Sequence, residues 1–161
     1  MRKLLEHGPC FICGTSNPDS MGVTWWADAA GCIHTTITLS VAQQGPPGYV
    51  HGGASAALLD EVMGMAVWNA GYQVASVNLE CEYRRPLPLG TELHVMGEIV
   101  EKTGSAIRAR GTITLPDGTQ AVIGRGIYVE APHLFEHIMG APTRSEAEQR
   151  PDPSEAADRR A

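Results

Sequence analysis

The sequence predicts an α+β domain in which one long helix is wrapped by a single antiparallel sheet. First, residues 53–69 form a helix-length run whose only charged residues are Asp60 and Glu61. Second, the segments on both sides of this run alternate apolar and polar residues, as strands with one buried face do. A helix that is apolar on all sides must be surrounded by protein, and one apolar sheet face can provide that cover.

The chain before the helix predicts a hairpin and a long loop. Residues 23–28 and 32–41 alternate around Ala29-Ala30-Gly31, which is typical of two strands joined by a turn. The second strand should point Ile33, Thr35, Ile37 and Leu39 to one side. Residues 43–48 then form a loop rich in glycine and proline that leads to His51 and the helix.

Four further strands follow the helix, which Gly71 should end. They are expected at about residues 74–85, 92–99, 107–115 and 121–130, with a hairpin signal at Pro116-Asp-Gly118. The apolar face of the first of them comprises Ala75, Val77, Leu79, Cys81 and Tyr83. We expect a turn-rich N-terminal segment at 1–22, the domain at 23–139 and a mobile tail at 140–161.

The composition excludes several classes of function. The net charge of −6 offers no basic surface for a phosphate backbone, so we expect no nucleic-acid partner. No apolar run is long enough to cross a membrane, and residues 1–8 lack the apolar centre of an export signal. We therefore expect a cytoplasmic protein whose four cysteines stay reduced.

Asp60 is the leading candidate for a catalytic group. Its helical neighbours three and four residues away are Ala56, Ala57, Met63 and Gly64, none of them polar. Burying an unpaired carboxylate costs several kcal/mol, so a carboxylate kept in such a place is a functional candidate. Glu61 also has small or apolar neighbours, and helix geometry alone barely separates the two.

Several motifs, in order, carry a resemblance to a known family. They are Cys10-Phe-Ile-Cys-Gly14, Gly45-Pro-Pro-Gly-Tyr-Val50, His51-Gly-Gly with Leu58-Leu-Asp60, and Tyr83-Arg-Arg-Pro-Leu-Pro-Leu-Gly90. Together they resemble the hotdog-fold acyl-CoA thioesterases, in particular the phenylacetate-pathway and 4-hydroxybenzoyl-CoA thioesterase branch. The resemblance implies the hotdog fold, an acyl-CoA substrate and no metal or redox cofactor. It also implies that the acid nine residues after His51, which is Asp60, is catalytic.

Gly52 and Gly53 at the helix start suit an oxyanion hole, because amides there are unpaired and the dipole favours negative charge. Equally, two glycines would simply permit a sharp turn into the helix. Asp60 lies roughly 10 Å further along the axis than Gly53, too far for both to act on one thioester. We therefore expect a homodimer, or a dimer of dimers, with Gly53 of one chain facing Asp60 of another, and His51 ordering the loop.

Candidate substrate-binding residues surround this motif. Gln44 precedes Gly45, where many relatives carry Asn, and could orient water or the carbonyl. Ser76 matches a position where relatives carry Ser or Thr, although alternation places it on the polar face.

Three arginines are candidates for the CoA phosphates. Arg84 and Arg85 should point in opposite directions, and Arg125 lies on an otherwise apolar face. Solvated charge that balances nearby glutamates explains Arg84 and Arg85 at least as well.

One motif stays outside this assignment. His7-x-x-Cys10-x-x-Cys13 has metal-ligand spacing, but the chain has no second C-x-x-C, although Cys32 and His34 could complete a site. We expect no metal there and interpret the segment as a small apolar turn over one end of the core. The alternative to an enzyme is a non-catalytic hotdog module that binds an acyl-CoA or acyl-carrier thioester.

Overall fold

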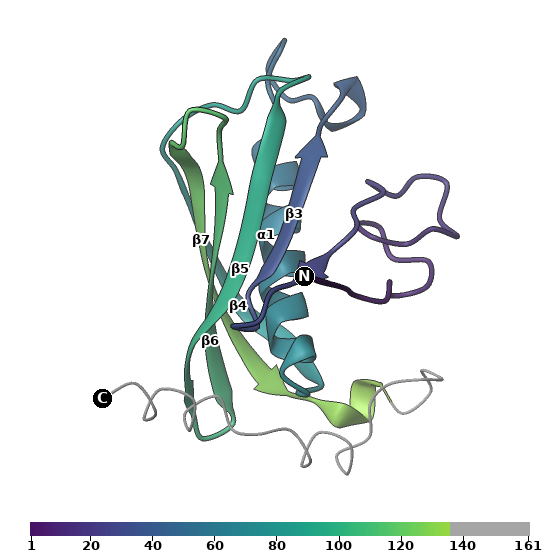
Figure 1. Ribbon diagram of the computed structural model, residues 1–161, viewed down its shortest axis with the longest axis vertical. Helices are drawn as coiled ribbons and strands as arrows, with labels where there is room; N and C mark the ends of the chain where they lie inside the picture. The colour runs from purple at the N-terminus through teal and green to yellow at the C-terminus, as the bar shows by residue number, and fades with distance from the viewer. Residues whose placement is uncertain (136–161) are drawn as a thin grey trace.

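The structure, a computed structural model, describes residues 1–135 and consists of one long helix against a seven-stranded antiparallel sheet (Figure 1). The strands are β1 (Arg2–Lys3), β2 (Trp26–Ala27), β3 (Ile33–Thr38), β4 (Val74–Tyr83), β5 (Glu92–Thr103), β6 (Ala106–Thr114) and β7 (Gln120–Glu130). They lie in the order β1-β2-β3-β5-β6-β7-β4. The α+β hotdog architecture is therefore confirmed, and the expected tail at 140–161 lies outside the described residues.

The helix α1 (Gly52–Asn69) begins one residue before the predicted start and ends where predicted. It stops at a turn in which Gly71 has a φ of +94°, a conformation that favours glycine. Leu58, Leu59, Val62, Met63 and Val67 are fully buried against the sheet. The apolar run is thus a core helix, and none of the helices within residues 1–135 meets the length and hydropathy of a membrane span.

A row of glycines lets α1 lie close to the sheet. Gly97 of β5, Gly111 of β6 and Gly124 of β7 are direct cross-strand partners, so they form one line across three strands. A Cβ atom at Gly97 would lie 2.7 Å from the main-chain oxygen of Val62 in α1. Cβ atoms at Gly111 and Gly124 would lie 2.9 and 3.2 Å from the side chain of Leu59. This row was not predicted from the sequence.

The predicted inward face of β3 is confirmed at Ile33 and Thr35, which are buried. In β5 and β6, Leu93, Val95, Ile107 and Ile113 are fully buried. The first strand of the predicted hairpin is much shorter than expected, since β2 spans only two residues. Strand β1, which pairs with β2, was not expected at all.

The predicted faces of β4 are wrong at its start. A bulge between Ser76 and Asn78 shifts the register against β7, so simple alternation fails across it. Strand β4 lies at the edge of the sheet, and two of its apolar side chains are exposed to solvent: Val77 is 59% exposed and Leu79 38%. These two side chains therefore leave an apolar surface at the end of the sheet.

The N-terminal segment forms an irregular lobe beside β3 (Figure 1). It is tied to the sheet through β1 and through the Leu4 amide, which donates to the Trp25 carbonyl at 2.9 Å. Ile12 and Cys13 are buried in the core. This segment therefore contributes side chains to the core, whereas the boundary at residue 22 stays a prediction.

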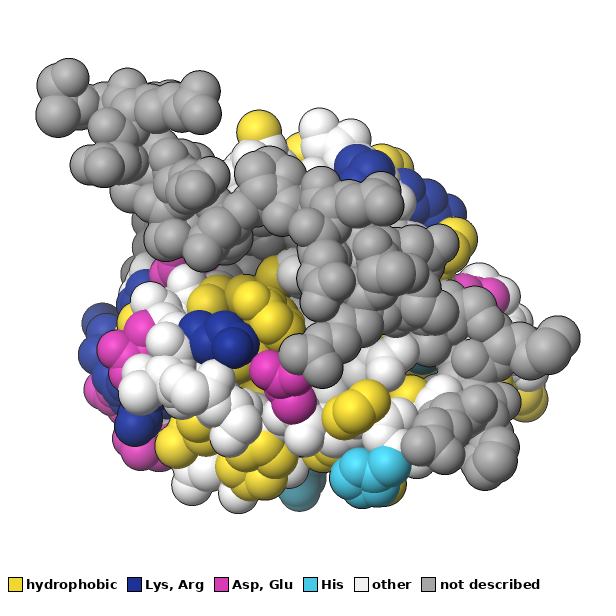
Figure 2. Space-filling model, turned by 90° about the horizontal axis from the view of Figure 1, so that it is seen from below, with side chains coloured by type: hydrophobic (Ala, Val, Ile, Leu, Met, Phe, Trp, Pro, Cys, Tyr) yellow, Lys and Arg dark blue, Asp and Glu magenta, His cyan; other side chains and the backbone are white. Residues whose placement is uncertain are grey.

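Seen from below (Figure 2), basic and acidic side chains are interspersed along one side of the molecule, and hydrophobic side chains show between them. The described side chains visible from this side form no continuous basic patch.

Candidate active site

The start of α1 is capped by the side chain of His51. The Gly53 amide donates to His51 Nδ1 at 2.9 Å, and the amides of Ala54 and Ser55 both bond to the His51 carbonyl. A Cβ atom at Gly53 would lie 3.0 Å from His51 Nδ1, so glycine lets the imidazole fold over the helix. Among residues 1–135, the Gly52 amide has no hydrogen-bond partner.

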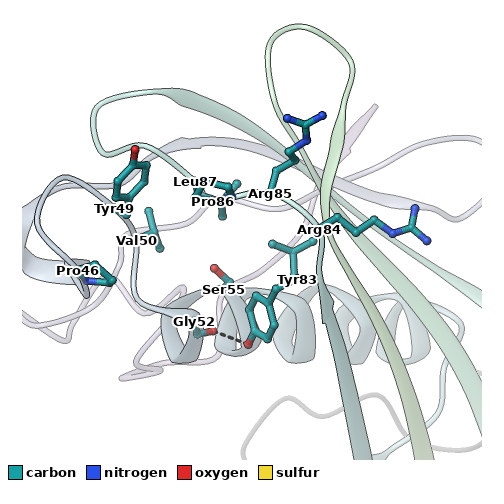
Figure 3. Close-up of a pocket in the computed structure, with 11 residues that line it drawn as sticks. Pro46, Tyr49, Val50, Gly52, Ser55, Tyr83, Arg84, Arg85, Pro86 and Leu87 are labelled. Atoms are coloured by element: carbon teal, nitrogen blue, oxygen red, sulfur yellow. Dashed lines mark hydrogen bonds between the residues drawn. The ribbon is translucent and has the colours of Figure 1, made fainter.

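A pocket of about 350 Å³ opens beside this helix start (Figure 3). It is lined by Pro46, Tyr49, Val50, Gly52, Ser55, Tyr83, Arg84, Arg85, Pro86, Leu87 and Val122. The Tyr83 hydroxyl donates to the Gly52 carbonyl at 2.9 Å, which fastens the end of β4 to the start of α1.

Sequence reasoning missed Ser55 and Tyr83 as pocket residues. Ser55 is a buried polar residue, 2% exposed, and it lies one helical turn after Gly52. That spacing is the signal that would have placed it beside the glycines.

Asp60 lies on a half-buried part of α1, and Tyr128 of β7 fixes it. The Tyr128 hydroxyl donates to Asp60 Oδ1 at 3.0 Å and to the Asp60 carbonyl at 2.9 Å. Tyr128 is only 3% exposed, and burial together with the charge of Asp60 raises the pKa of this phenol. The phenol therefore stays a proton donor to the carboxylate at neutral pH. Sequence reasoning missed Tyr128.

Ser76 lies on the same side of the sheet as Tyr128. The two residues are direct cross-strand partners in the antiparallel pair of β4 and β7, so their side chains project to one face. Beyond the bulge, Leu79, Cys81 and Tyr83 also pair with residues of β7 that face α1, since they oppose Gly126, Gly124 and Val122. The placement of Ser76 on the polar face is therefore wrong, because alternation does not continue through a bulge.

Glu61, the neighbour of Asp60, has different surroundings. Its Oε1 atom accepts from Cys13 Sγ at 3.2 Å and lies 3.3 Å from His7 Nδ1. Burial alone would raise the pKa of Glu61, but the hydrogen bonds from His7 and the cysteines outweigh it and hold the pKa below its usual value. The structure thus separates two carboxylates that helix spacing could not distinguish.

The loop before the helix uses its polar groups internally. Gln44 Oε1 accepts from the Gly48 amide at 3.0 Å, so this side chain orders the loop. A Cβ atom at Gly45 would lie 2.9 Å from the Cα atom of His51. An asparagine at position 45 would therefore need the chain around His51 to move.

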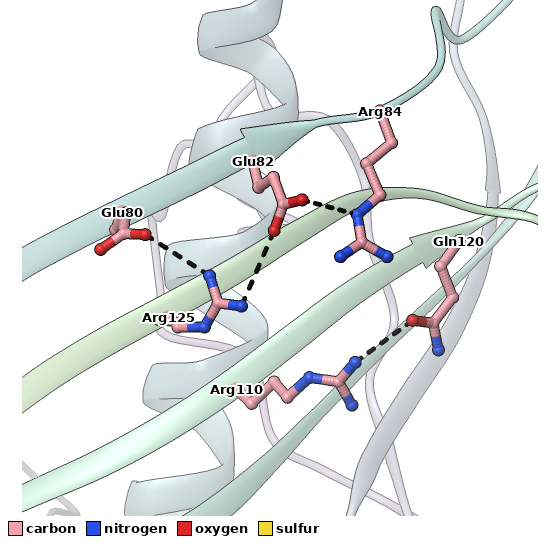
Figure 4. A network of polar contacts seen from close by, with 6 residues as sticks. All are labelled: Glu80, Glu82, Arg84, Arg110, Gln120 and Arg125. Carbon is pink, nitrogen blue, oxygen red and sulfur yellow. Dashed lines mark hydrogen bonds and ion pairs between the residues drawn. The ribbon is translucent and has the colours of Figure 1, made fainter.

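The three candidate arginines occupy different settings. Arg84 and Arg85 line the pocket, but their guanidinium groups extend away from Gly52 and in different directions (Figure 3). Arg84 pairs with Glu82 at 2.8 Å, and Arg125 pairs with Glu80 at 3.4 Å and Glu82 at 3.7 Å (Figure 4). The structure brings Arg84 and Arg85 to the pocket of this chain and leaves Arg125 in a surface network.

The pocket and Asp60 lie apart within one chain. Ser55 is the last residue of α1 that lines the pocket. Asp60 lies eight residues beyond Gly52, about 12 Å along a helix that rises about 1.5 Å per residue. A single thioester carbonyl could not contact both groups of the same helix.

Comparison with known proteins gives matches of several kinds. A profile of the thioesterase superfamily matches residues 47–122. Acyl-coenzyme A thioesterase THEM4 of Rattus norvegicus is 35% identical over 92 residues, which is 57% of this chain and 37% of the rat protein. The protein from Xenopus laevis with the same name is 34% identical over 93 residues, or 57% of this chain and 39% of the frog protein. The chain thus spans less than half the length of these relatives.

Among solved structures, a thioesterase superfamily protein superposes with a TM-score of 0.74 and 34% identity, covering 76% of this chain and 60% of that one. A Streptococcus mutans protein bound to acetyl CoA superposes with a TM-score of 0.64 at 16% identity, covering 68% of this chain and 88% of that one.

Proposed function

We propose that the chain is a member of the thioesterase superfamily, whose profile matches residues 47–122, and that it hydrolyses an acyl-CoA thioester to the free acid and CoA. The observation that carries the proposal is the pairing of a half-buried Asp60, held by Tyr128, with a glycine-rich helix start that opens on a pocket. The names of the THEM4 relatives and the acetyl CoA bound to the Streptococcus mutans protein support the substrate class.

In the proposed reaction, Asp60 supplies the carboxylate and water supplies the oxygen that ends on the acid. Asp60 either takes a proton from the attacking water, or attacks the carbonyl itself to form a mixed anhydride that water then hydrolyses. Both routes need the carboxylate beside the thioester carbon. The carbon–sulfur bond breaks and the CoA sulfur leaves with a proton. No metal or redox step is needed in this sequence.

The developing oxyanion is held at the helix start, where the dipole favours negative charge. Gly53 was the expected donor, with Gly52 as a substrate-binding residue. The Gly53 amide already donates to His51 Nδ1, whereas the adjacent Gly52 amide is unpaired within residues 1–135 and borders the pocket. We therefore assign the hydrogen bond to the oxyanion to the Gly52 amide. Gly53 and His51 order the turn that orients this amide.

The two halves of the site come from two chains. The separation of about 12 Å between Gly52 and Asp60 along one helix supports this. So do the half-exposed small residues around Asp60 and the open apolar edge of β4. A second chain that covers these surfaces would bring its own helix start to Asp60. A strictly monomeric enzyme with full activity, by ultracentrifugation and assay at one concentration, would refute the arrangement.

Arg84 and Arg85 are the proposed contacts for the CoA phosphates, since arginine suits phosphate geometry and both border the pocket. Arg125 would reach a ligand only by giving up its glutamate pairs. Ser76 is a proposed polar contact near Asp60. Gln44 is expected to act through the loop, because its side chain is already bonded to Gly48.

The test is thiol release from a panel of aliphatic and aromatic acyl-CoAs by the parent protein and by Asp60→Asn. The amide keeps the shape of the side chain but removes the charge, so kcat should fall by at least about 100-fold. Asp19→Asn, at an exposed turn, is the matched control and should keep full activity. Equal activity of Asp60→Asn and the parent would show that Asp60 is not the catalytic group.

The alternative is a non-catalytic module that binds the thioester. The loop before His51 favours it, because its polar groups are not available to position water. Neither Gly45 nor Gln44 offers a free polar group to position water. Binding of CoA by calorimetry without thiol release from any acyl-CoA would establish that alternative.

A further inference from the structure

Four potential metal ligands meet where the N-terminal lobe contacts α1. They are His7, Cys10, Cys13 and Glu61, and one ligand atom from each lies within 4.8 Å of all the others. Three come from the seven-residue stretch 7–13 of the lobe, and the fourth comes from the middle of the core helix. No residue of this cluster takes part in the proposed thioester chemistry.

The separations of Glu61 from the other three ligands are close to those of a tetrahedral site. Glu61 Oε1 lies 3.2 Å from Cys13 Sγ, 3.3 Å from His7 Nδ1 and 3.5 Å from Cys10 Sγ. In a tetrahedral zinc site with bonds of about 2.0–2.3 Å, neighbouring ligand atoms are about 3.3–3.8 Å apart. A zinc ion could therefore bind with only small shifts of these side chains.

The backbone holds the two cysteines in place. The Gly14 amide donates to the Cys10 carbonyl at 3.0 Å, and the Ile12 amide donates to Cys10 Sγ at 3.3 Å. A Cβ atom at Gly14 would collide with the main chain of Cys10 and Gly8, so only glycine fits this tight turn. An amide that points at the sulfur favours a thiolate, which is the form that binds metal.

Glu61 and His7 are fixed by other parts of the fold. Glu61 is carried by the core helix and is only 18% exposed in its side chain. The imidazole of His7 lies 5.7 Å, between ring centroids, from the indole of Trp68 in the same helix. The donors are thus preorganised by the turn on one side and by α1 on the other.

We propose that His7, Cys10, Cys13 and Glu61 bind one structural zinc ion per chain. Two thiolates, an imidazole and a carboxylate are a donor set that suits zinc, and softer sulfur ligands disfavour magnesium or calcium. All four positions are filled by protein, so the site leaves no open position for substrate. Zinc binding displaces the protons of both thiols. Without metal, burial and the charge of Glu61 raise the pKa of the Cys13 thiol, so this thiol keeps its proton.

The fourth ligand differs from those suggested by the sequence. Cys32 and His34 could have completed the site by spacing, but His34 Nε2 lies 3.0 Å from Asp28 Oδ2 and its other nitrogen lies 3.3 Å from His94. Glu61 was invisible as a ligand because it lies 48 residues beyond Cys13. Zinc would connect the N-terminal lobe to α1 at Glu61, the residue that follows Asp60.

The first test measures the zinc content of the purified full chain by mass spectrometry, with expression in zinc-supplemented medium. We expect about one zinc per chain, and X-ray absorption should show two sulfur and two nitrogen or oxygen neighbours. Zinc below about a tenth per chain, combined with no zinc uptake at micromolar concentration, would overturn the proposal. A Cys10–Cys13 disulfide in freshly purified protein would equally overturn it in favour of a redox pair.

Variants separate the site from general folding. Glu61→Gln keeps the size of the side chain and should weaken zinc affinity on the order of 10-fold or more, and Cys10→Ser should lose the metal. Cys32→Ser, which changes a half-buried cysteine outside the cluster, should keep full zinc content. Because the readout is metal content, it does not depend on whether the chain hydrolyses thioesters. Equal zinc affinity in Glu61→Gln and the parent would exclude Glu61 as a ligand.

Discussion

His51 acts as the N-cap of the core helix through a single side-chain hydrogen bond. Removing the acceptor with His51→Ala should therefore lower the free energy of unfolding by about 1 kcal/mol. His51→Asn offers another acceptor at the cap and should restore most of this loss. Urea unfolding of the three proteins, followed by circular dichroism, checks the order; equal midpoints for Ala and Asn would contradict a capping role.

In the proposed reaction, Tyr128 positions Asp60 and does not itself react. Tyr128→Phe removes one hydrogen bond to a carboxylate, so kcat should fall by about 10-fold while KM changes little. Steady-state thiol release measures both constants. Tyr72→Phe is the matched control, because the Tyr72 ring lies under Lys102, away from Asp60. A loss in KM alone would indicate a role in binding instead.

Among single residues, the sequence predicted Asp60 as a catalytic candidate, from its apolar helical neighbours and from its position nine residues after His51. It could not predict the partner of Asp60, because Tyr128 is 68 residues away and meets it only through the packing of β7 on α1. Ser76 was assigned to the wrong face for a related reason. A bulge reverses which residues of a strand face the helix, and no residue of β4 predicts the bulge from the sequence.

The contact between α1 and the sheet depends on the three cross-strand glycines at its centre. Gly97→Ala places a methyl group against the main chain of Val62, which cannot move aside, so it should cost about 1–3 kcal/mol or prevent folding. Gly124→Ala meets only side chains, those of Leu59 and Met63, which can adjust, and should cost less than about 1 kcal/mol. Unfolding midpoints of both variants give the comparison, and a smaller loss for Gly97→Ala would contradict it.

The elements themselves were largely predictable, because their signals are local. A run that is apolar apart from Asp60 and Glu61 predicted the helix to within one residue, and alternation with turn residues predicted five of the six expected strands near their observed positions. The lengths of β2 and β1 were not predictable, since both depend on pairing at the sheet edge.

For the whole molecule, a site shared between two chains predicts complementation. Asp60→Asn chains keep the helix start, and Gly52→Val chains keep Asp60 but block the pocket, so each variant alone should be inactive. A refolded equal mixture should recover about a quarter of the parent activity, because half of randomly formed dimers carry one intact site. Thiol release before and after mixing measures this.

The control for that mixture is the double variant with both changes in one chain, mixed with the parent. An equal mixture should show about half the activity of the same amount of parent chains alone, because a mixed dimer then has no intact site. Failure of the two single variants to complement, while ultracentrifugation shows mixed dimers, would place Gly52 and Asp60 of one chain in the same site.

The apolar edge at Val77 and Leu79 has a further consequence for how activity scales with the amount of protein. If paired chains alone are active, the number of working sites below the dissociation constant falls with the square of the chain concentration. A tenfold dilution in that range would lower the rate about 100-fold. Thioester turnover in a cell would then respond to expression of this chain as a threshold, remaining negligible at low abundance and rising steeply once chains meet often enough to pair.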